Sequence, residues 1–207
     1  MTFWNSDFRK QCWGFAARLL CADSAVRIGP GFTCDGVPNI WHTADGTVEI
    51  GRDVYFRRHV EIRAHHSARV IIGDGVRIDR DVRILATENA VVEIGAGCSI
   101  GMASVLNAKE SISIGEKVLV SGFVYLQTSM HTYAAPGAIK DLGYTYAPIR
   151  IGTGAWIGAH AVVMPGVSMG EGSVLGANAV LTADAEAEAI YAGVPARRLR
   201  GRFGEQP

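Results

Sequence analysis

The stretch VVEIGAGCSIGMASVL, residues 91–106, contains the pattern that decides the fold of this chain. Its large apolar residues Ile94, Ile100 and Leu106 stand six positions apart, and the smaller Cys98 and Ser104 stand four positions after the first two. A helix would place apolar residues at steps of three and four. A step of six, with glycine or polar pairs between, therefore predicts short strands joined by tight corners.

The same phrase recurs along the chain as VRIG, VEIG, VIIG, VEIG, ISIG, IRIG and VSMG. Successive phrases are separated by 22, 22, 22, 20, 37 and 18 residues, counted between their central residues Ile28, Ile50, Ile72, Ile94, Ile114, Ile151 and Met169. Three such strands per turn, stacked turn on turn, predict a solenoid with a continuous interior column of Ile, Val and Leu. The extra residues of the longer turns, near 65–69 and 85–90, are interpreted as bulges on one corner.

Composition narrows the possible partners and compartments. The 207 residues include 20 Lys plus Arg and 20 Asp plus Glu, so no overall basic field would attract nucleic acid. Four cysteines without a CxxC pair, and an N-terminus without the features of a secretory signal, predict reduced thiols in a cytoplasmic protein. Cys34 and Cys98 fall in inward positions and are predicted to be buried structural thiols. No uncharged apolar run is long enough to span a bilayer.

One separation, from Ile114 to Ile151, breaks the period. These 37 residues exceed a plain turn of 18 by 19, and the excess is assigned to a protruding loop at 131–148. Loops of this length are uncommon in compact domains and are often functional. The loop leaves the predicted coil at His131, in the stretch LQTSMHTYAAP. This position makes His131 the leading candidate for a functional histidine, although an ordinary polar loop residue is the simpler alternative.

The repeat, the loop and the motifs AWIG, IGAHAVVMPGVSMGEGSVLGANAVLT and YAGVPARRLR resemble the hexapeptide-repeat family, over residues 26–200. Within that family they resemble the trimeric galactoside, maltose and xenobiotic acetyltransferases. The resemblance implies an all-β fold, a left-handed parallel β-helix, and a homotrimer that uses acetyl-coenzyme A (acetyl-CoA) as co-substrate without a metal. It also places the catalytic histidine of these enzymes at His131, some two dozen residues before the AWIG motif.

An imidazole with an ordinary pKa near 6.5 suits this role, because it can take the proton of a hydroxyl as that hydroxyl attacks a thioester. The predicted activity is therefore direct O-acetylation of a sugar or glycan hydroxyl with His131 as the general base, and surface polysaccharide biosynthesis is the expected context. The acceptor could also be an antibiotic or an amino sugar. No covalent acyl-enzyme is required.

The resemblance further implies a groove for acetyl-CoA between two subunits. It assigns the groove lining to Trp156, Ala159, Ala177 and Thr182, and the phosphate contacts to Arg197 and Arg200. Arginine suits phosphate because its planar fork of donors can bind two oxygens at once. The alternative for Trp156 is an interface aromatic without a ligand, and for the arginines a solvated tail. Related enzymes carry an asparagine at the position that holds Gly101 here, so the donors to the oxyanion are left unassigned.

The two ends are predicted to be appendages of the coil, which spans residues 26–182. Residues 1–25 form an amphipathic helix that caps the first turn, with apolar residues at helical spacing, namely Trp4, Phe8, Cys12, Phe15, Ala16 and Leu19. Its tryptophans and basic residues would also suit a helix lying on the inner membrane. The repeat ends after Leu181, and residues 183–207 form a cap and tail that begins with a short helix or turn.

Two other functions remain open. A γ-carbonic-anhydrase-like zinc enzyme shares this coil, but the histidine pairs of this chain miss the spacing of its ligands. A β-helix scaffold without catalysis would keep the repeat and would not need the histidine, tryptophan and arginine positions. The segments GTGAWIG and GEGSVLG look like nucleotide-binding loops, but their glycines occupy repeat corners and no crossover helix follows them.

Overall fold

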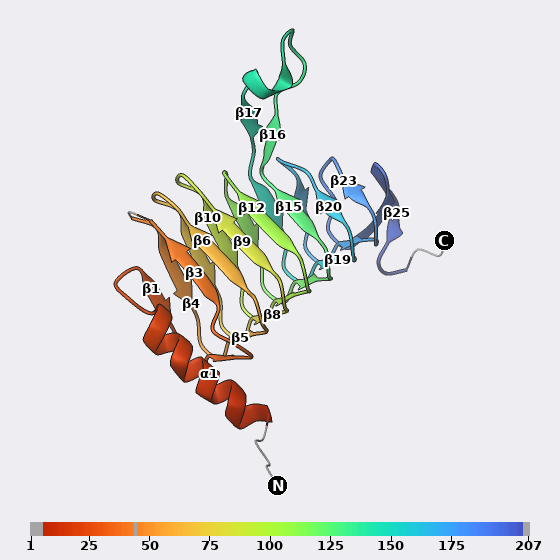
Figure 1. Cartoon of the computed structure of the whole chain (residues 1–207). Coiled ribbons are helices and arrows are strands. Elements are labelled where there is room, and N and C mark those ends of the chain that lie inside the picture. Colours follow the sequence, from red (N-terminus) through yellow and green to blue (C-terminus); the bar gives the residue numbers. More distant parts are fainter. Residues whose placement is uncertain (1–5, 44, 205–207) are drawn as a thin grey trace.

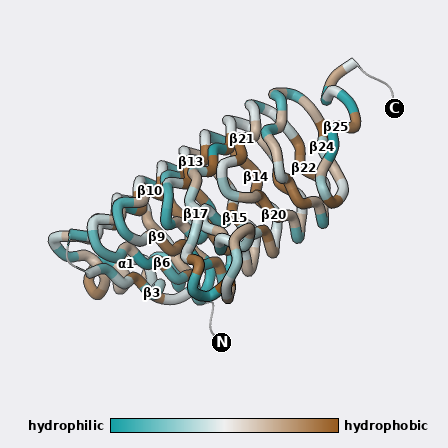
Figure 2. The backbone as a smooth tube through the Cα atoms, turned by 90° about the horizontal axis from the view of Figure 1, so that it is seen from above, coloured by the Kyte–Doolittle hydropathy of each residue, from teal (hydrophilic) through white to brown (hydrophobic). Residues whose placement is uncertain are grey.

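The computed structural model describes residues 6–43 and 45–204 and shows one helix followed by a long parallel β-helix (Figure 1). The helix α1 (Ser6–Cys21) lies across the N-terminal end of the coil, and the last strands close the opposite end. Seen from above, the turns stack along one axis between these two ends (Figure 2). Phe3 and Trp4, which belong to the predicted helix, lie outside the described residues.

Three sheets form the sides of the coil, and neighbouring strands within each are parallel except for the last pair of the second sheet. Face A consists of β1 (Val26–Ile28), β4 (Thr47–Ile50), β7 (Arg69–Ile72), β10 (Val91–Ile94), β13 (Ile112–Ile114), β18 (Ile149–Ile151) and β21 (Ser168–Met169). Face B begins with β2 (Thr33–Cys34), β5 (Tyr55–Phe56), β8 (Arg77–Ile78), β11 (Ser99–Ile100), β14 (Leu119–Val120), β19 (Trp156–Ile157) and β22 (Val174–Leu175). Face C consists of β3 (Asn39–His42), β6 (Glu61–Ala64), β9 (Arg83–Ala86), β12 (Val105–Ala108), β15 (Tyr125–Gln127), β20 (Val162–Val163) and β23 (Val180–Leu181).

The interior column follows the six-residue period. Ile94 pairs in register with Ile72 on one side and Ile114 on the other, and all three side chains are buried. Because equivalent inward positions stack, each turn buries the apolar side chains that a single turn would leave exposed. The prediction of a hexapeptide-repeat parallel β-helix is therefore confirmed. Cys34 and Cys98 lie inside it, fully buried, and burial raises the pKa of the Cys34 thiol to about 11.

Two features of the corners explain the sequence. At the corner between faces A and B, adjacent turns approach so closely that a Cβ on Gly95 would lie 2.6 Å from the carbonyl carbon of Gly115. Only glycine fits such an approach of two backbones. The corner between faces C and A is longer and accommodates the extra residues of the 22-residue turns, between β6 and β7 and between β9 and β10. The predicted bulges on one corner are found there.

The C-terminal end differs from the expectation that the repeat stops after Leu181. Ala185 forms a parallel bridge with Met169, and β24 (Ala189–Gly193) adds to face B with Tyr191 opposite Leu175. The final strand β25 (Ala196–Gly201) then pairs antiparallel with β24 and ends face B. Residues 183–189 form no helix, because they contribute a shortened further turn whose inward positions are alanines.

Helix α1 caps the first turn, but with a different face from the one its apolar spacing suggests. Gly14 and Ala17 are buried against the coil, and a Cβ on Gly14 would collide with the carbonyl oxygen of Phe32. Phe8, Phe15 and Leu19 are instead exposed. Small residues thus let the helix backbone approach the coil closely, and the apolar stripe points outward. No helix in the described part of the chain is long and apolar enough to cross a membrane.

Candidate active site

The protruding loop is an antiparallel hairpin rather than an irregular segment. Its arms are β16 (Ser129–His131) and β17 (Tyr144–Tyr146), and a single 3-10 turn η1 (Ile139–Asp141) lies near its tip. The hairpin leaves the coil between faces C and A and stands well above it (Figure 1). It therefore begins at Ser129, before the position expected for the loop, and His131 lies on its first arm.

A buried threonine holds the base of this hairpin. The hydroxyl oxygen of Thr128 accepts hydrogen bonds from the backbone N–H groups of Lys109 and Glu110, at 2.9 and 3.0 Å. The Thr128 carbonyl accepts a further bond from the N–H of Ala147 at 3.0 Å, which joins the two ends of the hairpin. These bonds fix the direction in which the arms leave the coil, and with it the position of His131.

His131 is exposed and its ring packs against Tyr144 of the facing arm, with ring centroids 4.1 Å apart. The ammonium group of Lys109 lies 5.6 Å from the centroid of Tyr144 and 5.5 Å from that of Tyr146. Within the described residues the imidazole nitrogens of His131 have no hydrogen-bond partner. The ring is thus positioned by stacking, while both nitrogens remain accessible to a substrate or to a second protein chain.

Trp156 lies on face B, on the outer side of β19, and is 47% exposed. Its indole N–H donates a hydrogen bond to the hydroxyl oxygen of Ser121 at 3.1 Å. Ser121 follows β14, the neighbouring strand of the same face, where Leu119 pairs with Trp156. The bond holds the indole against the sheet and leaves a broad apolar surface open to solvent.

Ala159 and Ala177 occupy equivalent positions at the corner between faces B and C. The carbonyl of Ala159 accepts a hydrogen bond from the N–H of Asn178, the residue after Ala177, at 2.8 Å. Because neither side chain extends beyond a methyl group, a ligand running along this corner can reach the backbone. Beside them, the rings of Phe123 and His160 stack at 4.7 Å with an interplanar angle of 1°.

The structure places some of the residues predicted to bind acetyl-CoA on one face of the coil and others elsewhere. Arg200 pairs with Ile190, Ile190 with Val174 and Val174 with Trp156, so Arg200 lies on face B three strands from the indole. Arg197 lies on the same strand β25. Thr182 differs, because it follows β23 on face C and belongs to the next corner of the coil.

His131 and Trp156 do not meet within one chain. The hairpin that carries His131 leaves from the corner between faces C and A, and face B lies opposite that corner of a three-sided coil. A reaction that uses both residues therefore requires a second copy of the chain.

Sequence reasoning missed three residues of this region. Ser121 occupies an ordinary repeat position, and nothing in its spacing marks it as the partner of an indole. Lys109 likewise stands in a turn that looks like any other. Tyr144 had a detectable signal, because the alternation in YTY ahead of Pro148 is typical of a strand and could have suggested the second arm of a hairpin.

The remaining histidines near the N-terminal turns have local partners. His59 contacts Asp81 at 3.1 Å and His66 contacts Glu88 at 3.5 Å. His42 lies 2.9 Å from Asp23, and this hydrogen bond is the main cause that lowers the pKa of the Asp23 carboxyl. No group of three or more potential metal ligands assembles among the residues that the structure describes. A zinc site built across subunits is not tested by one chain, so the absence of a metal stays a prediction.

Comparison with known proteins agrees with the fold and the repeat. The family model "Bacterial transferase hexapeptide (six repeats)" matches residues 148–183, and "Hexapeptide repeat of succinyl-transferase" matches residues 91–127. The galactoside O-acetyltransferase of Escherichia coli is 37% identical over 91 residues, 44% of each chain. A probable acetyltransferase of Mycobacterium tuberculosis is 33% identical over 153 residues, 72% of this chain and 50% of that protein. A chloramphenicol acetyltransferase of Klebsiella aerogenes is 35% identical over 114 residues, covering 55% and 52%. The chain thus spans about half the length of the curated relatives it matches.

Solved structures extend this likeness to three dimensions. A maltose O-acetyltransferase from Clostridium difficile superposes with a TM-score of 0.56 over 63% of this chain and 68% of that chain, at 20% identity. A hexapeptide-repeat acetyltransferase from Vibrio cholerae, solved with acetyl-CoA, gives a TM-score of 0.50 over 64% and 67% at 26% identity. The chain is a hexapeptide-repeat β-helix protein. Its repeats match two hexapeptide-repeat transferase models, and the curated relatives that it resembles over part of their length are acetyltransferases.

Proposed function

We propose that this protein is an acetyl-CoA-dependent O-acetyltransferase that acts on a sugar hydroxyl, with active sites shared between the chains of a homotrimer. The observation that carries the proposal is the placement of His131 and Trp156. Both are exposed and both are held by specific contacts, yet they lie on opposite sides of one coil. In a closed ring of identical chains, the hairpin of one subunit can reach face B of the next.

The proposed reaction is a direct transfer. The His131 imidazole accepts the proton of the acceptor hydroxyl while the hydroxyl oxygen forms a bond to the thioester carbonyl carbon. The carbon–sulfur bond then breaks, and the imidazolium returns its proton to the departing thiolate. The products are an acetyl ester and free coenzyme A, so atoms and charge balance without an oxidant or a covalent acyl-enzyme.

The residues on and beside face B suit the binding of acetyl-CoA, the proposed acetyl donor. The small side chains of Ala159 and Ala177 leave the backbone of the corner open to the pantetheine arm, and Trp156 provides an apolar wall beside it. Arg197 and Arg200 are proposed to meet the phosphates at the C-terminal end of the face. The likeness to the Vibrio cholerae enzyme solved with acetyl-CoA supports this donor. Thr182 has the weakest support, because it lies at a different corner.

The acceptor is proposed to be a sugar because relatives named for galactoside and maltose acetylation share the repeat and the fold. The likeness to a chloramphenicol acetyltransferase keeps an antibiotic hydroxyl as the alternative. A role in surface polysaccharide biosynthesis, in the cytoplasm or at the inner membrane, is part of the same proposal. The exposed apolar stripe of α1, which has basic neighbours, supports the peripheral membrane contact.

The first test replaces the general base. His131→Ala is expected to lower acetyl transfer to a sugar acceptor by about 10²- to 10⁴-fold, measured as release of free coenzyme A. His66→Ala serves as the matched control, because His66 is an exposed histidine that contacts Glu88 and follows β6, three strands of face C before the hairpin. Equal activity of the two variants would exclude His131 as the base.

A second test asks whether one site uses two chains. His131→Ala and Trp156→Ala chains are each expected to be deficient alone. When they are co-expressed and assemble at random, about a quarter of the interfaces combine an intact histidine with an intact tryptophan, so activity should recover to about that fraction. A mixture that stays as inactive as the single variants would mean that both residues serve within one chain, contrary to the proposal.

A further inference from the structure

The corner between faces B and C changes its chemistry from one end of the molecule to the other. Its backbone hydrogen bonds link equivalent positions in successive turns, and we call these positions the corner row: Arg58, Arg80, Met102, Gly122, Ala159 and Ala177. The carbonyl of each of the first five accepts a bond from the next turn, at 2.8 to 3.1 Å. The row thus starts with two arginines and ends with the two alanines that are proposed to face the donor.

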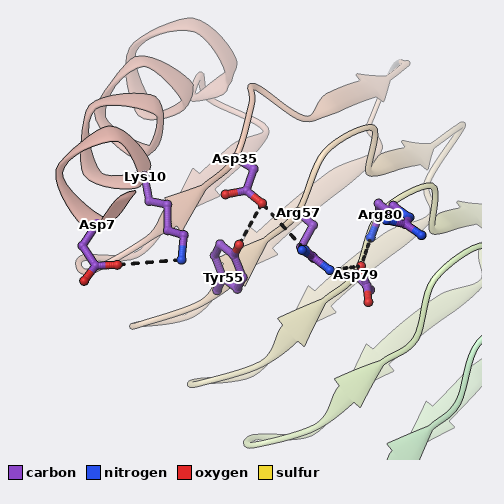
Figure 3. Close-up of polar contacts among 7 residues, drawn as sticks. All are labelled: Asp7, Lys10, Asp35, Tyr55, Arg57, Asp79 and Arg80. Atoms are coloured by element: carbon purple, nitrogen blue, oxygen red, sulfur yellow. Dashed lines mark hydrogen bonds and ion pairs between the residues drawn. The ribbon is translucent and has the colours of Figure 1, made fainter. Parts of the chain in front are cut away.

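Two of the three arginines on this part of the coil lack an acidic partner among the described residues. Arg57 is engaged, with Asp35 at 3.7 Å and Asp79 at 3.3 Å, as Figure 3 shows. Asp79 is the main cause that raises the pKa of Arg57. Arg58 and Arg80 have no ion pair in the described part of the chain, and the side-chain contact of Arg80 is to the sulfur of Met102 at 3.8 Å. Their charges are therefore not neutralised by the protein.

The two carboxylates beside these arginines, Asp35 and Asp81, have other side-chain partners. Asp81 contacts His59 at 3.1 Å, and Asp35 accepts a hydrogen bond from the Tyr55 hydroxyl at 2.9 Å. Arg9, on α1, adds a third exposed guanidinium without an ion pair among the described residues. Together with Arg57, Arg58 and Arg80 it lines a recess of about 400 Å³, and Asp35, His59 and Asp81 line the same recess. The four guanidinium groups therefore outnumber the two carboxylates of the lining. Guanidinium groups stay charged at any physiological pH, so they repel one another until an anion separates them.

The recess continues toward the proposed reaction centre. Arg57 also lines a second, mainly apolar depression of about 450 Å³ on face B, which ends at Ser121. Ser121 is the hydrogen-bond partner of Trp156. Adjacent turns are about 4.8 Å apart, so Arg80 lies about 14 Å from Ala159 along the corner row. An extended molecule can therefore have one end at the arginines and the other beside the indole.

We propose that Arg9, Arg58 and Arg80, with Arg57 beside them, bind a phosphate or diphosphate group carried by the acetyl acceptor. Arginine forks bind phosphate oxygens in pairs, and three of them around one recess give a site for a dianion. The proposal rests on the proposed function, since donor phosphates at the C-terminal end of face B would leave this recess to the acceptor. The substrate class is then a sugar attached through phosphate, such as a nucleoside diphosphate sugar.

The test measures binding, so it does not depend on catalysis by His131. Isothermal titration of the full-length protein with inorganic pyrophosphate, and then with uridine diphosphate glucose, should show saturable binding at one competitive site. Arg58→Gln with Arg80→Gln should weaken both at least tenfold. The matched control, Arg52→Gln with Arg69→Gln, removes the same charge from two exposed arginines outside the recess and should leave the affinity within about twofold.

Three results would overturn the proposal. The first is no saturable binding of pyrophosphate, or an equal loss in the control variant. The second is a parallel tenfold loss of acetyl-CoA affinity in the Arg58 and Arg80 variant, which would assign the arginines to the donor. The third is a loss restricted to binding of phosphatidylglycerol vesicles, which would make the recess a lipid headgroup contact. An inactive His131→Ala enzyme that still binds pyrophosphate would leave both proposals intact.

Discussion

The coil and its two appendages use apolar residues in opposite ways. Inside the coil, large side chains such as Ile62, Ile84 and Leu106 are fully buried and repeat from turn to turn. On helix α1 and the hairpin β16–β17, large apolar and aromatic residues are exposed instead; they include Phe8, Phe15, Leu19, Leu20, Tyr133, Ile139, Tyr144 and Tyr146. No residue from 129 to 146 is buried.

This difference separates stability from recognition. Burial of apolar surface is the main favourable term in folding, and nearly all of it in this chain comes from the coil. The appendages contribute little to that term, and their exposed rings are suited to contact another chain, a ligand or a lipid surface. The candidate base His131 belongs to an appendage, whereas the proposed donor groove belongs to the coil.

The largest expected effect is on the coil interior. Leu106→Ala should lower the free energy of unfolding by about 2–5 kcal/mol, because Leu106 is fully buried between two neighbouring turns and leaves a cavity. Leu19→Ala on α1, where the side chain is 67% exposed, should change it by less than about 0.5 kcal/mol. Urea unfolding at fixed protein concentration measures both. A loss of several kcal/mol for Leu19→Ala would show that a second chain covers the helix.

The reactivity of the cysteine thiols should also differ between the coil interior and helix α1. Burial raises the pKa of Cys34 to about 11, whereas Cys12 lies exposed on α1. At pH 8 the thiolate of Cys34 should be about a hundredfold scarcer than that of an ordinary thiol, which corresponds to about 2.7 kcal/mol. Mass spectrometry after iodoacetamide treatment should therefore find Cys12 labelled and Cys34 protected until the protein unfolds.

The raised pKa of Cys34 should make the free energy of unfolding depend on pH, because the pKa differs between the folded and unfolded states. The folded state favours the neutral thiol, so its stabilising contribution is complete below the unfolded pKa near 9 and is lost as pH rises toward 11. Urea midpoints of Cys34→Ser and the unaltered protein should converge as pH rises through this window. A constant difference across it would contradict the raised pKa.

Sequence reasoning succeeded where the structure is periodic. The step of six fixes which residue of each turn points inward, and the interior column of Ile72, Ile94 and Ile114 follows from it directly. It failed at the appendages for a physical reason. The apolar stripe of α1 indicates a helix, but cannot say that the contact with the coil uses Gly14 and Ala17, since that depends on how closely two backbones approach. The pairing of His131 with Tyr144 is likewise a tertiary contact.

A smaller effect is expected at the corners of the coil. Gly95→Ala should cost about 1–3 kcal/mol, because the added Cβ would lie 2.6 Å from the carbonyl carbon of Gly115 and the turns must separate. Gly36→Ala is the control within the same coil, since a Cβ there meets no heavy atom within 4 Å. Its effect should be neutral or slightly stabilising, by up to about 1 kcal/mol. Equal losses at the two glycines would mean that close approach does not explain the repeat.

The smallest effect on stability should come from removing the hairpin, although its effect on activity should be complete. The carbonyl of Thr128 and the N–H of Ala147 are joined by a 3.0 Å hydrogen bond across its base, so residues 129–146 can be replaced by Asn-Gly in a two-residue turn. No buried side chain is lost, and closing the shorter loop costs about 1 kcal/mol less in conformational entropy. The unfolding free energy should therefore stay the same or rise slightly, while acetyl-CoA still binds and acetyl transfer disappears. If the shortened chain also lost several kcal/mol at a given protein concentration, the hairpin would be holding subunits together, and His131 would act from within a stabilising interface rather than from a free arm.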